Sequence, residues 1–203
     1  MVLNIKKVDK TKSQTFTNLA KAFVGESEAR NRYTMYSSIA KKEGYEQIAS
    51  IFLETSEQER EHASILYKTL NMMKGKTTLP TLKIETEVPL IYGTTIENLK
   101  SAITGETYEK NIMYIQFSDI ALQEGFKDIA LKLRAIAVAE THHFERFSKL
   151  LTELENKSIF KKTEEIEWTC RQCGYVHKGK EAPNECPLCE HPKSFYQKKL
   201  EEY

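Results

Sequence analysis

The chain has 203 residues, and 30 Lys and Arg face 29 Asp and Glu, so its net charge is +1. This balance offers no basic surplus for nucleic acid or an anionic membrane, and we expect neither as a partner. No apolar run approaches the roughly 18 residues that span a bilayer, and the N-terminus lacks the apolar core of a signal peptide. We therefore expect a soluble cytoplasmic protein, long enough for one helical bundle and a small second module.

Apolar positions recur with helical spacing along most of the chain and predict four long helices. The predicted helices run from about 14 to 42, 45 to 73, 95 to 123 and 126 to 155. Gly44 and Gly125 separate the members of each pair, because glycine permits the left-handed backbone common after a helix. The polar, lysine-rich residues 1–13 are expected to form a loosely held lead-in.

Residues 76–93 have no helical period and contain Pro80, Pro89 and Gly93. A connection of this length can extend to ~60 Å, whereas a helix of ~29 residues is only ~43 Å long. We therefore predict a crossover that returns the chain to the opposite end of the bundle.

Each predicted helix carries a glutamate in a stripe that is otherwise apolar. These residues are Glu26, Glu59, Glu106 and Glu140. An unpaired ionised carboxylate in a core costs many kcal/mol, so it takes up a proton or binds a cation. His62 and His143 each follow a glutamate by three residues, which places carboxylate and imidazole on one helix face. Four carboxylates and two imidazoles that converge in this way indicate bound metal.

The second pair of helices repeats the first with one residue inserted. Glu106 lies 80 residues after Glu26, whereas Glu140 lies 81 residues after Glu59. The halves also differ one turn beyond Glu106, where Glu109 replaces Ala29. Glu109 is therefore a further candidate ligand, and the alternative is a solvated or ion-paired residue.

All four cysteines lie near the C-terminus, as Cys170-x-x-Cys173 and Cys186-x-x-Cys189. Two such pairs separated by 12 residues are typical of a tetrahedral thiolate site, which holds iron or zinc. A module of ~35 residues needs such a metal to fold, because it cannot bury an adequate core. We expect His177 and His191 at the surface, since four thiolates already fill the site.

The predicted domains are a bundle over 1–156, a linker over 157–166 and a four-cysteine module over 167–203. This arrangement resembles rubrerythrin over essentially the whole chain. The resemblance is carried by Gly25-Glu26-Ser27-Glu28-Ala29-Arg30-Asn31-Arg32-Tyr33, Gln58-Glu59-Arg60-Glu61-His62, Gly105-Glu106-Thr107-Tyr108-Glu109, Ala139-Glu140-Thr141-His142-His143 and the four cysteines. It implies a mainly α fold, a ferritin-like four-helix bundle with a long crossover, followed by a small rubredoxin-like four-cysteine domain.

The resemblance also implies two non-haem irons in the bundle and one iron on the cysteines, for which zinc can substitute. In such a site Glu59 and Glu140 bridge the irons, while Glu26 and Glu106 are terminal ligands. His143 binds one iron, and the other exchanges Glu109 for His62 when the site is reduced.

Tyr33 and Tyr114 are implied to hydrogen-bond site carboxylates, and the alternative is a pair of ordinary buried tyrosines. With these tyrosines included, the expected catalytic set is Glu26, Tyr33, Glu59, His62, Glu106, Glu109, Tyr114, Glu140 and His143.

The implied activity is reduction of hydrogen peroxide to water, in protection against oxidative stress, with electrons relayed through the four-cysteine iron. The expected partners are a donor protein, rubredoxin or an NAD(P)H-dependent reductase, and a second copy of the chain in a homodimer or larger homo-oligomer. Two alternatives stay open: a ferroxidase or iron-handling ferritin-like protein, and a zinc-ribbon interaction module on a helical scaffold.

Overall fold

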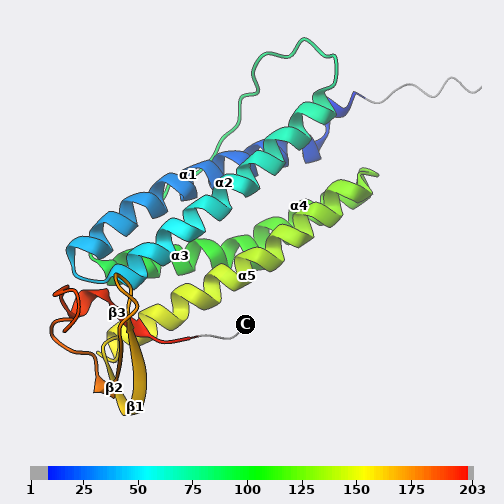
Figure 1. Ribbon diagram of the computed structural model, residues 1–203. Helices are drawn as coiled ribbons and strands as arrows, with labels where there is room; N and C mark the ends of the chain where they lie inside the picture. Colours follow the sequence, from blue (N-terminus) through cyan, green and yellow to red (C-terminus); the bar gives the residue numbers. More distant parts are fainter. Residues whose placement is uncertain (1–8, 201–203) are drawn as a thin grey trace, which may run out of the picture.

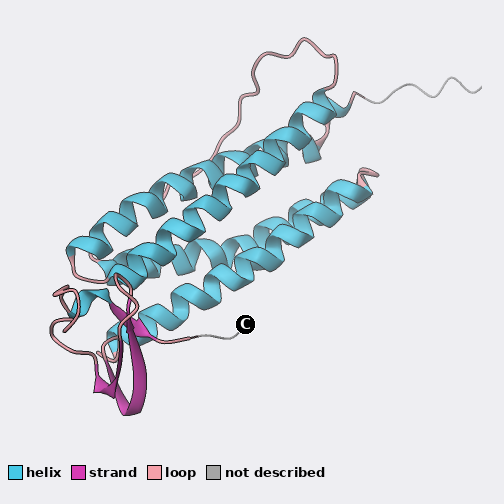
Figure 2. Ribbon diagram, in the orientation of Figure 1, coloured by secondary structure: helices cyan, strands magenta, loops and turns pink. Residues whose placement is uncertain are grey.

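The computed structural model describes residues 9–200 and shows two helical hairpins with a small β module at one end (Figures 1 and 2). The helices are α1 (Gln14–Lys42), α2 (Glu46–Lys74), α3 (Thr95–Tyr108), η2 (Glu109–Met113), α4 (Tyr114–Gln123) and α5 (Lys127–Glu155). α1 pairs with α2, and the combined arm of α3, η2 and α4 pairs with α5. The predicted mainly α bundle is confirmed. Of the expected lead-in, residues 1–8 lie outside the described residues, and Lys10–Lys12 form a short 3-10 helix.

Local sequence signals set the helix ends. The Ser13 hydroxyl accepts a hydrogen bond from the Phe16 amide at 3.1 Å, and Thr94 forms a reciprocal capping box with Glu97. Each of these caps satisfies amides that a helix leaves without internal partners. Gly44 and Gly125 have φ values of 82° and 83°, the left-handed conformation expected at these two breaks.

The two hairpins are joined at both ends by carboxylates in their turns. Glu124 accepts hydrogen bonds from the amides of Gln14 and Thr15, each at 2.8 Å. At the opposite end, Glu43 accepts one from the Thr95 amide at 3.0 Å. The start of α3 therefore lies beside the α1–α2 turn, as the predicted crossover requires.

The crossover closes the bundle within one chain. It leaves α2 at Gly75, runs back along the hairpin without regular structure, and enters α3 at Thr95 (Figure 1). The Tyr36 hydroxyl donates a hydrogen bond to the Ile91 carbonyl at 2.8 Å, which holds the end of the crossover against α1.

The third arm differs from the single helix predicted over 95–123. A five-residue π-helical segment, η2, interrupts it at Glu109–Met113. A π turn accommodates one extra residue within a helix and often occurs at functional sites. The inserted residue that shifts the repeat from 80 to 81 therefore lies next to Glu106, inside the helix, and not in a turn.

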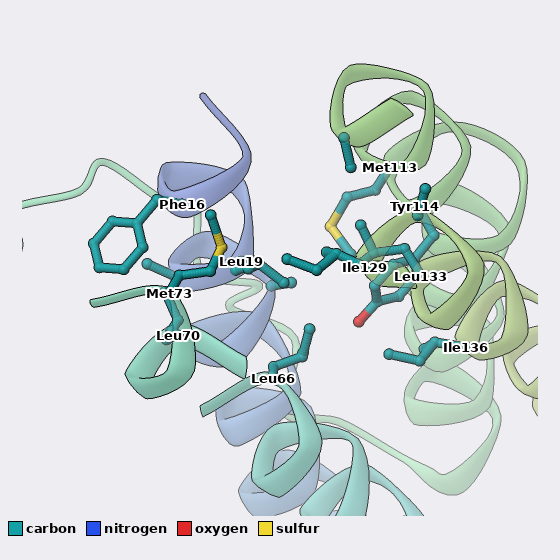
Figure 3. Close-up of a cluster of buried hydrophobic side chains, with 14 of the residues drawn as sticks. Phe16, Leu19, Leu66, Leu70, Met73, Met113, Tyr114, Ile129, Leu133 and Ile136 are labelled. Atoms are coloured by element: carbon teal, nitrogen blue, oxygen red, sulfur yellow. The ribbon is translucent and has the colours of Figure 1, made fainter. Parts of the chain in front are cut away.

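Two apolar clusters fill the bundle, one toward each end. One includes Leu19, Leu66, Met113 and Leu133, which Figure 3 shows between the hairpins, and Phe16, which lies beside Met73. The other includes Tyr36, Phe52, Leu99, Phe147 and Leu150. On every arm the predicted glutamate lies between the residues of these two clusters. Within residues 9–200, no helix is long and apolar enough to cross a membrane.

The C-terminal module is a three-stranded antiparallel sheet in the order β2–β1–β3. Its strands are β1 (Lys161–Cys170), β2 (Val176–Glu181) and β3 (Tyr196–Lys198), with a 3-10 turn, η3 (Lys193–Phe195), before β3. Trp168 is fully buried at its centre. The module lies at the α1–α2 turn, where the rings of Tyr45 and Phe160 stack with centroids 6.3 Å apart.

The segment expected to be a linker, 157–166, contains the first part of β1. Lys161 pairs with Glu181 and Ile166 pairs with Gly179 in the β1–β2 ladder. Most side chains over 161–165 are exposed, and the ladder pairs this segment only at Lys161 and Ile166, with an irregular register between them. The sequence therefore lacks the alternation of apolar residues that marks a half-buried strand.

Candidate metal centres

Six buried side chains from all four helical arms meet at mid-bundle, and we call them the bundle centre. They are Glu26 on α1, Glu59 and His62 on α2, Glu106 on α3, and Glu140 and His143 on α5. The four glutamates are each at most 1% exposed, and His62 is 9% exposed. The helical spacing anticipated this convergence, because glutamate and histidine three positions apart share a helix face.

The bundle centre contains two overlapping groups of possible metal donors. One group is Glu26, Glu59, His62 and Glu140, and the other is Glu59, Glu106, Glu140 and His143. Within each group the donor atoms lie within 4.8 Å of one another. Glu59 and Glu140 belong to both groups, whereas each group has its own histidine and its own further glutamate.

The shared carboxylates face both imidazoles. Glu59 places Oε2 at 3.0 Å from Nδ1 of His62 and Oε1 at 3.1 Å from Nδ1 of His143. Glu140 places Oε1 at 3.0 Å from the first nitrogen and Oε2 at 2.7 Å from the second. Each carboxylate thus offers one oxygen to each donor group, an arrangement suited to two cations ~3.5–4 Å apart.

Several buried atoms at the bundle centre form no hydrogen bond within the described part of the chain. They are Oε2 of Glu26, Oε1 of Glu59, Oε2 of Glu106, both carboxylate oxygens of Glu140 and Nδ1 of His143. A buried polar atom without a partner costs ~1–3 kcal/mol, and a charged one costs more. Two cations would satisfy this set, so the donors fit a pair of metal ions. Carboxylates with one imidazole for each position suit iron.

Two glutamates of the bundle centre, Glu26 and Glu106, bind protons more readily than ordinary glutamates do. Burial and the charges of Glu140 and Glu59 hold the pKa of Glu26 well above its ordinary value. Burial raises the pKa of Glu106 to about 8, against the opposing ion-pair contact with His143. Metal binding must therefore displace protons from this site.

Glu59 and the imidazoles instead favour their charged forms. Burial opposes ionisation of Glu59, but its ion-pair contacts with His143 and His62 outweigh it and lower its pKa to about 2. Burial also disfavours the charged form of His143, yet its ion-pair contacts with Glu106, Glu140 and Glu59 raise its pKa to about 12. Without metal, protonated imidazoles therefore balance part of the carboxylate charge.

Tyr33 and Tyr114 reach the bundle centre from opposite halves of the repeat. The Tyr33 hydroxyl donates to Oε1 of Glu106 at 2.5 Å, and the Tyr114 hydroxyl donates to Oε1 of Glu26. Both hydroxyls are buried, and each leaves the second oxygen of its glutamate directed at the centre. Each tyrosine donates to the glutamate of the other half of the repeat, although each also lies two turns beyond a glutamate on its own arm.

Glu109, the first residue of the π turn, lies outside both donor groups. Burial, followed by the charges of Glu26 and Glu106, raises its pKa well above the ordinary value, so its carboxyl is near the centre. The neighbours Glu61 and His142 are exposed, as their positions on another helix face predict. The structure thus brings His62 into the donor group and holds Glu109 next to it.

Gln58 is a polar partner of the bundle centre that was not predicted from the sequence. Oε1 of Gln58 lies 3.0 Å from Nε2 of His143, the ring nitrogen that faces away from the carboxylates. The repeat contained a signal for it, because Ala139 precedes Glu140 where Gln58 precedes Glu59. A partner on the outer nitrogen orients a metal-binding imidazole.

The four cysteines form a second group in the C-terminal module, with all sulfur atoms within 4.8 Å of one another. Sγ of Cys170 lies 3.7 Å from that of Cys189, and Sγ of Cys173 lies 3.6 Å from that of Cys186. A disulfide needs ~2.05 Å, whereas four thiolates at ~2.3 Å from a shared metal lie ~3.8 Å apart. The geometry fits one tetrahedrally bound ion.

The surroundings of Cys186 favour its thiolate form. Burial raises the pKa of Cys186, but the Tyr196 hydroxyl and the amides of Cys189 and Leu188 outweigh it and lower that pKa to about 6. His177 and His191 lie outside the group and are half-buried, not fully at the surface. Nδ1 of His191 is 3.0 Å from the Cys189 carbonyl, a contact that the expectation of a surface residue missed.

A four-helix bundle with paired carboxylate and imidazole donors at its core is the architecture of the ferritin-like di-iron proteins. Comparison with known proteins narrows this class. The family model for rubrerythrin matches residues 17–151, and the model for the rubrerythrin rubredoxin-like domain matches residues 168–197. The chain belongs to the rubrerythrin family.

Individual relatives agree over nearly the full chain. A relative from Methanocaldococcus jannaschii that carries the rubrerythrin name is 53% identical over 193 residues, which cover 94% of this chain and 95% of that one. The rubrerythrin of Porphyromonas gingivalis is 46% identical over 186 residues, which cover 91% and 90%. A structure of nigerythrin in a mixed-valence state covers 98% of this chain and 92% of its own, with 31% identity and a TM-score of 0.60.

The family and the two donor clusters together establish the metal complement. The chain is a di-iron carboxylate protein with a rubredoxin-like four-cysteine site, and it belongs to a family of oxidoreductases. The predicted family, fold and cofactors are therefore confirmed.

Proposed function

We propose that this protein reduces hydrogen peroxide to water, with electrons that enter through the four-cysteine iron. The observation that carries the proposal is the presence, in one chain, of a buried two-metal donor site and a separate four-thiolate site. Storage or oxidation of iron requires no built-in electron relay, so the thiolate module favours the peroxidase over the ferroxidase alternative. The reaction consumes two electrons and two protons for each peroxide and yields two molecules of water.

In the proposed site Glu59 and Glu140 would be shared by the two irons, because each directs one oxygen to each donor group. Glu26 and Glu106 would each serve one ion and are held by the hydroxyls of Tyr114 and Tyr33. Bound iron would supply the two electrons that peroxide reduction requires. The near-complete burial of the carboxylates excludes bulk water from the reacting atoms.

His62 and Glu109 are the proposed alternative ligands of one position. The described arrangement, with His62 inside the donor group and Glu109 outside it, corresponds to the reduced form in this proposal. A neutral imidazole suits a ferrous ion, and an anionic carboxylate suits a ferric one. The position of Glu109 at the π turn supports its role as the residue that moves.

The proposed electron path crosses between two chains packed head to tail. The four-cysteine module lies beyond the α1–α2 turn, where an added Cβ on Gly44 would be 3.7 Å from Ser194. Glu59 is 15 residues from Gly44, so a helix of that length places the bundle centre at least ~22 Å from the module. A second copy packed in the opposite direction would bring its own module beside the bundle centre. The ultimate donor is proposed to be rubredoxin or an NAD(P)H-dependent reductase.

Anaerobic stopped-flow measurements test the reaction. The fully reduced protein should be oxidised by hydrogen peroxide much faster than by dioxygen, and the ferric-thiolate absorption should appear with the same peroxide dependence. Faster oxidation by dioxygen would instead support the ferroxidase alternative. A colourless purified protein that contains only zinc would refute both redox functions.

Complementation between chains tests the electron path. Cys173→Ser removes the relay from one chain, and Glu59→Gln removes the bundle site from another. An equimolar mixture, paired at random, should recover about a quarter of wild-type peroxidase activity, because half of the dimers are mixed and each mixed dimer contains one working pair out of two. Each variant alone should be inactive with the reductase. No recovery in mixtures shown to contain mixed dimers would place the path within one chain.

A further inference from the structure

The two imidazoles of the bundle centre are held differently on their outer nitrogens. Nε2 of His143 lies 3.0 Å from Oε1 of Gln58, which comes from α2 in the other hairpin. Within residues 9–200, Nε2 of His62 has no hydrogen-bond partner, and this ring is held only through Nδ1. The repeat explains the difference, since the residue equivalent to Gln58 beside His62 is Ala139.

The hydrogen bond that Gln58 accepts determines which nitrogen of His143 faces the metal. An amide oxygen can only accept, so the proton of the neutral ring stays on Nε2 and the lone pair of Nδ1 points to Glu59 and Glu140. A ring held in this way pays little further orientation entropy when it binds a cation. No such bond holds the outer nitrogen of His62, so its ring is held at Nδ1 alone, by the carboxylates that would also bind the metal.

A second asymmetry falls on the same side of the bundle centre. Glu109 replaces the Ala29 of the first half, and the strongest charge that acts on it comes from Glu26, a member of the His62 group. The charge of Glu26 thus couples Glu109 to the donor group whose imidazole has no outer bond. The imidazole with the outer bond has no such carboxylate in the repeat.

We propose that Gln58 is a positioning residue that makes the two metal positions unequal, with tight binding at His143 and weaker, faster-exchanging binding at His62. The proposal rests on the ligand roles in the proposed function and deepens them. It gives a physical reason why ligand exchange occurs at His62 and not at His143. Ala139 is the corresponding determinant, because a small apolar residue there leaves the His62 ring free to depart.

Zinc titration of the full-length protein tests this inequality without turnover. The four-cysteine site is filled with Zn²⁺ first, and two further equivalents are followed by calorimetry and by ¹⁵N NMR of the histidines. In the wild-type protein the first of these equivalents should shift the His143 resonances and the second those of His62, with distinct affinities.

Three variants assign the effect to the outer hydrogen bond. Gln58→Ala should weaken the tight step by 10- to 100-fold, the usual cost of losing such a partner, and change the weak step less than threefold. Gln58→Glu retains an acceptor oxygen and should restore the tight step. Ala139→Gln supplies the missing acceptor and should strengthen the weak step. Thermal unfolding of the apoprotein variants checks that each is folded.

Several results would overturn the proposal. They are equal wild-type affinities, occupation of His62 before His143, an equal loss of both steps in Gln58→Ala, or no loss in that variant. These outcomes are separate from failure of the peroxidase proposal. Unequal binding that follows these substitutions, in a protein that does not reduce peroxide, would retain the inference and remove only the proposed reaction.

Discussion

Tyr33 donates its hydroxyl hydrogen to Oε1 of Glu106 at 2.5 Å, across 73 residues of sequence and between two hairpins. Tyr114 makes the reciprocal bond to Glu26. The two bonds cross the centre of the bundle and tie each half of the repeat to the carboxylate of the other. They therefore combine a structural role with orientation of two proposed metal ligands.

Replacement of Tyr33 by phenylalanine tests both roles. Loss of the buried donor should lower the free energy of unfolding of the metal-free protein by roughly 1–3 kcal/mol, measured by urea denaturation. It should also weaken zinc binding at the bundle centre, because Glu106 loses its orientation. Tyr36→Phe is the matched control, since its hydroxyl bonds to the Ile91 carbonyl away from the centre. Equal effects of the two variants on zinc affinity would contradict the orienting role.

The stability of the metal-free protein should fall as pH rises from about 4.5 toward 8. Burial raises the pKa of Glu106 from 4.5 to about 8, so between these values the folded protein binds a proton that the unfolded chain has lost. Its contribution is fully present below the lower value and disappears above the higher one. Urea unfolding at pH 5 and pH 8 measures the slope. Glu106→Gln should flatten it, and Glu61→Gln, at an exposed position, should not.

Zinc affinity at the bundle centre should have the opposite pH dependence to the stability of the metal-free protein. The same protons must leave before the carboxylates bind a cation, so zinc affinity at the bundle centre should increase over the same pH range. Calorimetric titrations in buffers of different ionisation enthalpy measure the protons released. Proton release that is zero at pH 6 would show that the carboxylates are already ionised in the apoprotein.

Glu124 should stabilise the junction between the hairpins at neutral pH. Burial slightly disfavours its ionised form, but bonds from Thr15 and the Gln14 amide outweigh this and lower its pKa below 4.5. A depressed pKa gives stability that is present above pH 4.5 and is lost as pH falls through the folded value. Glu124→Gln should therefore cost roughly 1 kcal/mol at pH 7, as loss of a helix cap does, and less at pH 3.5. Glu145→Gln, on the exposed face of α5, is the control.

The four-cysteine module should depend on its metal while the bundle does not. Cys173→Ser removes one of four thiolates, so the ferric-thiolate absorption should vanish and the module should unfold. Helical circular dichroism of the bundle should persist, because its two apolar clusters are separate from the module. His191→Ala should retain the absorption, since this histidine bonds to the Cys189 carbonyl and lies outside the thiolate group. Loss of colour in His191→Ala would assign it a role in metal binding.

The parts that could be predicted are those encoded by local spacing. Glycines at the turns, caps at the helix starts and apolar stripes depend on residues within a few positions of one another. The same holds for glutamate and histidine three apart and for the paired cysteines. The start of β1 over Lys161–Ile166 could not be predicted, because most of its side chains are exposed and leave no apolar pattern to recognise.

Amino-acid order alone determined the four helical arms, the length of the crossover and the residues that meet at the bundle centre, because periodicity and motif spacing act over a few turns. Only the packed bundle decided that Tyr33 serves Glu106, that Gln58 holds His143, and that the extra residue of the second half forms a π turn at Glu109. These pairings join residues 73 and 85 positions apart. They depend on how two hairpins rotate and slide against each other, which no local pattern specifies.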